Sequence, residues 1–311
     1  MLTTKKLITD AATIWRHLNG IVNIYKPSGV SVKQVQSTIT HKLCQDLNDM
    51  DVRPPREMIK IEAVAGGETY VVTQEPNLAD YTLVVGERYQ MEDFKCNTSS
   101  YLGKFSSGVM RINKGTKKAF WLRKNRPIRV YHVTGRFGMS TETHFSDSAA
   151  TLRASFDHVT MNKLNSLLAS LQASHQKKMF ELCGVDIQSQ AAFELAVQGP
   201  LRPSVSNVPL IYSFRCIDFR KPYFTIEIHA TNESEAYLGI LIHEMGIHMK
   251  SVAHCTQIRC IRESHFTLED SLVRRHWNLE NLVNNMTMCE KLMRKHPEMI
   301  NQLDPTLHEE K

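Results

Sequence analysis

Hydrophobic and polar residues alternate in some stretches of the chain and recur at helical spacing in others. Residues 20–30 form a short apolar run that ends in a Pro/Gly turn, which predicts a strand. Ser31 follows and is the expected N-cap of a helix whose apolar residues recur three and four positions apart. The apolar face of this helix consists of Val32, Val35, Ile39 and Leu43.

Later segments continue this mixture of strands and helices. β-like runs are predicted over 58–65, 69–73, 82–91 and 129–138, and 209–219 with 223–230 should form an antiparallel hairpin. Helices are predicted over 160–171, over 233–246 with Gly246 as its end, and through much of the chain after residue 273. No internal repeat is present. The predicted class is α+β, with a mixed, largely antiparallel sheet flanked by helices.

Composition is that of an ordinary globular protein and argues against a membrane-spanning chain and against a disulfide-based scaffold. The chain has 311 residues, 42% of them hydrophobic, and no apolar run that approaches the length of a membrane span. Its seven cysteines are scattered and include no CxxC pair, which predicts thiols in a reducing compartment. Residues 1–19 contain Lys5, Lys6 and Arg16 among apolar residues. They fit either a mitochondrial transit segment, against which Asp10 argues, or a surface helix.

The charge is unevenly distributed, although the net charge is only +6. The 48 residues from Phe94 to Thr141 contain eleven basic side chains and no carboxylate. A solvated surface normally mixes both signs, so this segment predicts a polyanionic partner. Aromatic residues interleaved with the positive charges, such as Phe120 and Trp121, could stack on unpaired bases, which favours RNA over DNA. The alternative is a basic face for an acidic protein.

Motifs for metal or cofactor chemistry are weak or missing. "HEMGIH" places His243 and His248 five residues apart, whereas two zinc ligands on one helix face are four apart, and Gly246 interrupts the segment. No Walker or dinucleotide-binding glycine motif occurs, and no serine lies in a nucleophile elbow. We therefore expect no metal and no organic cofactor.

Six segments, in their order and spacing, resemble the TruB family of pseudouridine synthases, and in particular its animal mitochondrial branch. They are "IYKPSGVS" (24–31), "SSGVMRINKGTKKAF" (106–120), "VYHVTGRFGMSTET" (130–143), "SHQKKMFE" (174–181), "AFELAVQGPLRP" (192–203) and "CTQIRCIRESHFTLEDSL" (255–272). The resemblance covers roughly residues 20–272. It implies an enzyme fold that flips a uridine out of an RNA stem-loop, cleaves its glycosidic bond and reattaches the base through carbon.

The resemblance also implies which residues meet the RNA. Tyr131 corresponds to the family tyrosine that stacks on the flipped base, and Lys26 lies in the motif that supports the catalytic loop. The basic segment would follow the phosphates. The expected RNA-binding residues are Lys26, Arg111, Lys114, Lys117, Lys118, Tyr131, Arg259 and Arg262.

The sequence departs from the family where the chemistry takes place. The nucleophilic aspartate falls on Gly103, its arginine partner falls on Gly239, and a histidine that helps to extrude the base falls on Ser100. An unpaired buried charge is costly, so the loss of both partners is a coupled change. Asp93 lies ten residues before Gly103 and Asp147 lies beyond the strand predicted over 129–138, and neither can be assigned to the pocket from the sequence.

We therefore expect a possible transit segment at 1–19, a pseudouridine-synthase-like domain at 20–272 and a helical extension at 273–311. The predicted function is binding of tRNA or mitochondrial mRNA stem-loops in the mitochondrial matrix, with weak or absent isomerisation. The alternatives are an active synthase that uses a different carboxylate, a non-catalytic RNA chaperone, and a scaffold that binds proteins of a mitochondrial RNA granule.

Overall fold

The computed structural model describes residues 10–50, 56–63, 70–98, 100–114, 118–197, 199–201 and 208–299. Its centre is an eight-stranded sheet with the order β1-β5-β11-β6-β10-β9, in which β4 pairs with β5 and β12 with β11. The strands are β1 Gly20–Lys26, β4 Cys96–Thr98, β5 Ser107–Lys114, β6 Arg129–Phe137, β9 Leu210–Arg220, β10 Tyr223–Thr231, β11 Ala253–Glu263 and β12 Phe266–Thr267.

The pairing within this sheet is mixed. Every neighbouring pair is antiparallel except β5 and β11, which run parallel where Arg259 lies opposite Ser107. The α+β class and the largely antiparallel sheet are thus confirmed, as is the hairpin of β9 and β10. The parallel pair brings β11 beside the start of β5, and therefore beside the loop that contains Gly103.

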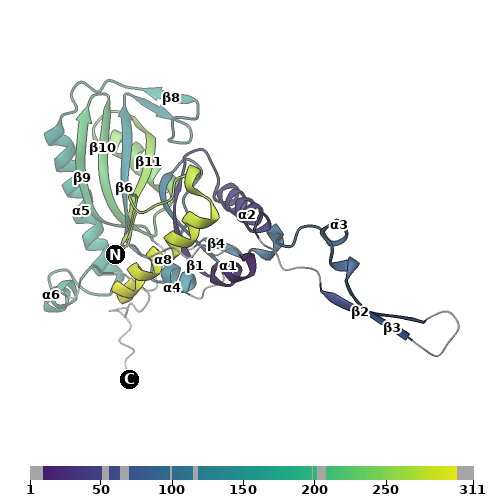
Figure 1. Ribbon diagram of the computed structural model, residues 1–311. Helices are drawn as coiled ribbons and strands as arrows, with labels where there is room; N and C mark the ends of the chain where they lie inside the picture. The colour runs from purple at the N-terminus through teal and green to yellow at the C-terminus, as the bar shows by residue number, and fades with distance from the viewer. Residues whose placement is uncertain are drawn as a thin grey trace, which may run out of the picture.

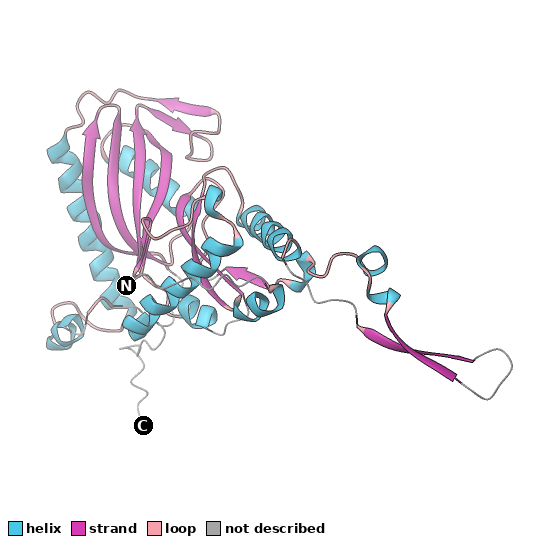
Figure 2. Cartoon of the chain, viewed as in Figure 1, coloured by secondary structure: helices cyan, strands magenta, loops and turns pink. Residues whose placement is uncertain are grey.

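Helices pack on both ends of the sheet, as Figures 1 and 2 show. Helix α5 (Met161–Leu182) runs along β9, and α7 (Glu235–His248) packs on β11 and β6. Helix α8 (Leu279–Lys295) packs on β1 and on α2 (Val32–Asn48), which in turn contacts α1 (Ala11–His17). Ser31 caps α2 as predicted, and its side chain forms a capping box with Gln34.

A two-stranded ribbon extends away from the rest of the molecule in Figure 1. It consists of β2 (Glu57–Ala63) and β3 (Tyr70–Pro76), and it is followed by η1 (Leu78–Asp80), α3 (Thr82–Val85) and η2 (Met91–Asp93). The prediction of a β-like run over 82–91 is wrong. Residues 82–85 form a single helical turn that Gly86 ends at φ +78°, and Leu83 within it is 95% exposed.

Smaller elements complete the described chain. They are α4 (Lys118–Lys124), β7 (Met139–Thr141), β8 (Ala150–Arg153), α6 (Gln190–Val197), η3 (Arg274–His276) and η4 (Pro297–Met299). The prediction that Gly246 ends a helix is wrong, because α7 continues to His248. Gly246 instead allows close packing, since a Cβ there would lie 2.8 Å from the Cβ of Ala253 on β11.

One hydrophobic core runs across the expected boundaries at residues 19 and 272. It contains Ala11 and Leu18 from the N-terminal side together with Trp277 and Leu282 from the C-terminal side. Residues 10–19 and 273–299 are thus packed parts of the same domain, whereas residues 1–9 lie outside the described part of the chain.

Candidate active site and RNA-binding face

The loop that joins β4 to β5 is held by the Lys-Pro-Ser-Gly turn that follows β1. Lys26 Nζ donates hydrogen bonds to the carbonyls of Ser106 at 2.7 Å and Pro27 at 3.1 Å. Ser28 Oγ donates to Phe105 O at 2.6 Å, and the Gly29 amide donates to Lys104 O at 2.8 Å. The turn therefore fixes the backbone of residues 104–106.

Lys26 supports this loop from the interior. Its side chain is fully buried, so the expectation that it contacts RNA is corrected to a role inside the protein. Burial lowers the pKa of Lys26 to about 8, and the negative charge of Glu235 acts against that lowering. Lys26 thus provides a buried positive charge directly behind the loop.

A carboxylate from a distant part of the sequence lies at Gly103. A Cβ added to Gly103 would overlap the carboxylate carbon and both carboxylate oxygens of Glu235. Glu235 is the first residue of α7, where the side chain of Ser234 caps the helix by accepting a hydrogen bond from the Tyr237 amide. The position that the family resemblance gives to an aspartate is therefore occupied by a glutamate that enters from α7.

Two donors from one residue hold the Glu235 carboxylate. Ser106 Oγ donates to Glu235 Oε2 at 2.7 Å, and the Ser106 amide donates to the same oxygen. The glutamate remains half-buried, so part of it is open to solvent. The carboxylate that reaches the loop is neither Asp93 nor Asp147, and Glu235 was missed because it lies 132 positions further along the chain than Gly103. The available signal was an acidic residue directly after a helix N-cap.

Gly239, the expected position of the arginine, faces an aromatic ring. A Cβ on Gly239 would lie 2.7 Å from Phe145 Cζ, and the Phe145 ring packs on Phe105 with centroids 4.6 Å apart. A long cationic side chain at 239 would have to displace Phe145. The site therefore has a carboxylate, but an aromatic pair takes the space beside it.

Arg111 belongs to the core. It is fully buried and forms a bidentate ion pair with Glu263, with Nη2 to Oε1 at 2.6 Å and Nε to Oε2 at 3.2 Å. Its amide donates to the hydroxyl of Ser100 at 3.1 Å, which fixes the start of the loop. The expectation that Arg111 binds RNA is wrong, because its charge is neutralised inside the protein.

Tyr131 is likewise enclosed. It is 3% exposed, and its hydroxyl donates to Glu233 Oε1 at 2.6 Å, an oxygen that also pairs with Arg129 Nε at 2.6 Å. Burial raises the pKa of Tyr131, and burial also raises the pKa of Glu233 despite the nearby Arg129. In this structure Tyr131 presents no stacking surface for a base, which corrects the expected contact, and Glu233 is buried beside it.

Exposed positive charges lie in the loop and along β11 instead. Arg259 is exposed on β11 beside Ser107, and its guanidinium carbon lies 5.8 Å from the ring centroid of Tyr25. Lys104 is exposed within the loop itself, and Arg262 is exposed further along β11. These three cations, with Tyr25, form what we call the basic rim.

The rest of the basic segment lies further along the chain. Lys114 ends β5 and Lys118 begins α4, while Lys117 lies outside the described residues. On α4, Phe120 and Trp121 are 58% and 43% exposed, and Lys124 Nζ lies 5.1 Å from the Trp121 ring centroid. Helix α4 thus exposes two aromatic rings, one of them beside a lysine.

The two histidines of "HEMGIH" do not meet as ligands. His243 stacks on His144 at 4.4 Å and shares a hydrogen bond with Ser140 Oγ at 3.2 Å, whereas His248 is exposed. Within the described ranges, one cluster has atoms close enough to share an ion, formed by His265, His296 and Glu298. Its two imidazole rings are nearly parallel at 3.8 Å, so their nitrogen lone pairs do not converge on one point.

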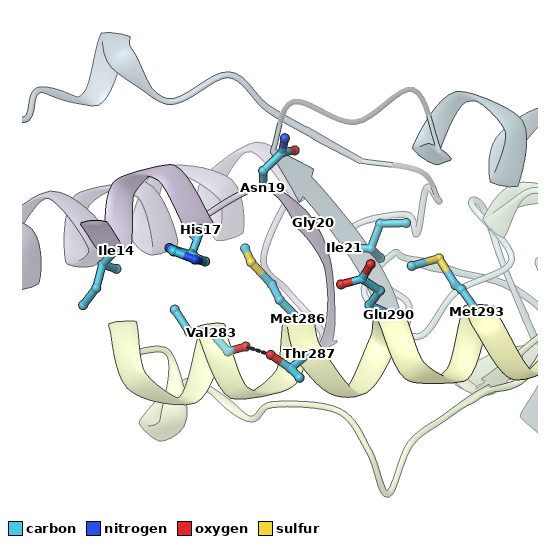
Figure 3. Close-up of a pocket in the computed structure, with 10 residues that line it drawn as sticks. All are labelled: Ile14, His17, Asn19, Gly20, Ile21, Val283, Met286, Thr287, Glu290 and Met293. Carbon is cyan, nitrogen blue, oxygen red and sulfur yellow. Dashed lines mark hydrogen bonds between the residues drawn. The ribbon is translucent and has the colours of Figure 1, made fainter. Parts of the chain in front are cut away.

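A pocket of about 240 Å³ lies between α1, the start of β1 and α8. Figure 3 shows Ile14 and Met286 lining it together with His17 and Glu290. None of the predicted site residues borders it. None of the helices in the described ranges combines the length and apolar character needed to cross a bilayer.

The fold and the site together define a mixed-sheet protein in which the half-buried carboxylate of Glu235, at the start of α7, meets the loop around Gly103 beside the basic rim. Residues 95–237 match the model of the TruB family pseudouridylate synthase (N terminal domain). The chain is 36% identical over 288 residues to the mitochondrial pseudouridylate synthase TRUB2 of Xenopus tropicalis, covering 90% of this chain and 88% of that one. It is 30% identical to the human protein of that name, covering 85% and 82%. The chain therefore belongs to the TruB family and to its animal mitochondrial branch.

The chain also shows similarity to chains of two solved complexes that contain Cbf5. The chain is 15% identical to one of them, a Cbf5-Nop10-Gar1 complex, with a TM-score of 0.44 over 95% of this chain and 62% of that chain. It is 13% identical to an archaeal box H/ACA sRNP Nop10-Cbf5 complex, with a TM-score of 0.46 over 92% and 60%. The chain thus spans about three fifths of the length of those two proteins.

Proposed function

We propose that this protein binds stem-loop RNA, either tRNA or mitochondrial mRNA, in the mitochondrial matrix and holds a uridine at the loop around Gly103. Membership of the TruB family supports RNA as the substrate class, and the relatives named above are mitochondrial. The family reaction, isomerisation of uridine to pseudouridine, is slow or absent in this chain. The physical reason is that Gly239 and Phe145 leave no room for a cationic partner beside the carboxylate.

The observation that carries this proposal is the basic rim. Lys104 and Arg259 are exposed on two adjacent segments that meet at the loop, with no acidic residue between positions 94 and 141. Phosphates that approach such a surface release condensed counterions, which makes binding favourable and dependent on salt. The exposed aromatics of α4 add base-stacking surfaces.

Fluorescence anisotropy with a labelled uridine-containing stem-loop, measured from about 50 mM to about 200 mM salt, tests this proposal. We expect affinity to fall steeply with salt. Arg259→Glu should weaken binding and lower the salt slope by about 0.7 to 0.9, the value of one phosphate contact. Arg220→Glu is the matched control, because Arg220 lies at a different height along the strands of the sheet. It is level with Arg136 on β6, whereas Arg259 is level with His132 on the same strand.

A chain that does not bind RNA even at low salt would contradict the proposal. It would favour the scaffold role, in which the basic rim contacts proteins of a mitochondrial RNA granule. An equal loss of affinity in the Arg220 control would show that the effect is one of net charge and not of the basic rim.

A further inference from the structure

We propose that Glu235 is the catalytic carboxylate of this protein and that it replaces an aspartate at position 103. The inference rests on the proposed function, since it concerns a uridine held at the same loop. It assigns the remaining slow isomerisation to a residue on α7 rather than to the loop itself.

The carboxylate is placed as precisely as a loop residue would be. Ser106 fixes one oxygen through two hydrogen bonds, and the backbone of Ser106 is fixed in turn by Lys26, which donates to its carbonyl at 2.7 Å. Glu235 is also the first residue of a 14-residue helix, where the helix dipole favours a negative charge. The second oxygen, Oε1, has no hydrogen-bond partner among the described residues and remains available to a ligand.

The observed position of the Glu235 carboxylate requires glycine at position 103. Any side chain at 103 would enter the volume that the Glu235 carboxylate occupies. An aspartate there would in addition place a second negative charge against the first, which low-dielectric surroundings disfavour. An aspartate at position 103 and the observed placement of Glu235 therefore exclude each other.

A buried positive charge accompanies the relocated carboxylate. Gly239 offers none, because Phe145 fills that side, but Lys26 lies close enough to Glu235 for the two charges to influence each other. Lys26 Nζ donates hydrogen bonds to backbone carbonyl oxygens. It has no carboxylate within salt-bridge distance in the described part of the chain. Its charge therefore acts on Glu235 only from a distance, through the loop between them. This weaker compensation agrees with a slow reaction.

The step that Glu235 would carry conserves atoms and electrons. A carboxylate oxygen bonds to C1′ of the ribose while the C1′–N1 bond breaks, and its electron pair stays on the uracil N1. After the base turns, its C5 attacks C1′ and the bond from C1′ to Glu235 breaks, which restores the carboxylate. The C5 proton is released to water and N1 takes up a proton, so the product is an isomer of the substrate.

Release of tritium from a stem-loop RNA that carries C5-tritiated uridine measures this step. We expect slow release by the wild type and a loss of at least about 100-fold in Glu235→Gln. Glutamine keeps an oxygen that can accept from Ser106, so the loop should stay in place while the charge is lost. Glu244→Gln is the matched control, because Glu244 is an exposed glutamate on the same helix and should leave the rate unchanged.

Two further variants separate catalysis from simple support of the loop. Gly103→Ala should displace the carboxylate and slow the reaction, while glutamate remains present. The double variant Gly103→Asp with Glu235→Gln returns the carboxylate to the loop and should recover activity relative to Glu235→Gln alone. A purely structural role of Glu235 predicts instead that Glu235→Gln alone keeps the wild-type rate, because glutamine still accepts from Ser106.

RNA binding, measured on the same preparations, distinguishes the two proposals. If the wild type binds RNA and releases no tritium, or if Glu235→Gln reacts as fast as the wild type, the assignment of Glu235 is overturned and RNA binding stands. If the wild type does not bind RNA, the proposed function itself fails. Thermal unfolding of each variant checks that the fold is retained.

Discussion

Charged residues of this protein fall into two groups that the sequence does not separate. Arg111 and Arg259 both belong to segments expected to bind RNA, yet one is fully buried and the other exposed. Arg111 lies on β5 inside the sheet, where it is enclosed by the core and paired with Glu263. Its environment makes it a structural residue, because a buried charge must find its partner within the protein.

Glu263→Gln should destabilise the protein by about 3–5 kcal/mol, because it leaves Arg111 as an uncompensated buried charge. Urea unfolding measures the change. Arg294→Gln breaks a pair with Glu290 in which the arginine is 77% exposed, and it should cost less than about 1 kcal/mol. Once the fraction of folded protein is taken into account, the affinity of Glu263→Gln for RNA should equal that of the wild type. A selective loss of RNA affinity would mean that Arg111 does reach the ligand.

Two elements in the first quarter of the chain differ in how they relate to the core. Helix α1 and the residue after it contribute Ala11 and Leu18 to the core, and Trp15 packs on Tyr89 at 5.1 Å. Ribbon β2–β3 extends away from the body, and Ile61 on it is 63% exposed. An isolated two-stranded ribbon is only marginally stable in water, so it depends on its attachment and contributes little to the stability of the core.

Leu18→Ala should therefore cost about 2–5 kcal/mol, whereas Ile61→Ala should change stability by less than about 0.5 kcal/mol. The two substitutions remove similar apolar groups from contrasting environments, with Leu18 1% exposed. Midpoints of urea denaturation give the comparison. A neutral Leu18→Ala would show that residues 10–19 are not part of the folded domain and would restore the idea of a detachable targeting segment.

At the scale of the whole molecule, the larger of the two hydrophobic clusters among the described residues also encloses four thiols. Cys44, Cys255, Cys260 and Cys289 are buried, and all seven cysteines are thiols rather than disulfides. Burial raises the pKa of Cys44 to about 11 and those of Cys255 and Cys289 to about 12. Burial raises the pKa of Cys260 as well. Such thiols are poor nucleophiles at neutral pH, which fits a structural role.

These thiols predict that the free energy of unfolding falls as the pH rises above about 9. The folded protein keeps their protons where the unfolded chain has lost them, so alkali favours unfolding. Lys26 acts in the opposite direction between about 8 and 10.5, since its folded pKa is the lower one. The four thiols outweigh the one lysine. Urea titrations from about pH 7.5 to about pH 10.5 measure the trend, and stability that rises across this range would contradict it.

Much of the fold is predictable because it depends on local patterns. The cap at Ser31, the alternation in β9 and β10 and the helical spacing in α5 each lie within a short stretch of sequence. The run over 82–91 failed because an apolar alternation forms a strand only where a neighbour is available for pairing. Gly246 failed as a helix end because its small size is used for packing on Ala253.

The sequence by itself determined the family, the α+β class, the basic segment and the presence of glycine at positions 103 and 239. Only the tertiary structure decided which of the positive charges are exposed and what fills the places beside those glycines. The physical reason is that burial and contact depend on pairs of residues far apart in the chain. The parallel pairing of β5 with β11 and the packing of α7 bring Arg259 and Glu235 to a loop more than 120 positions earlier in the sequence.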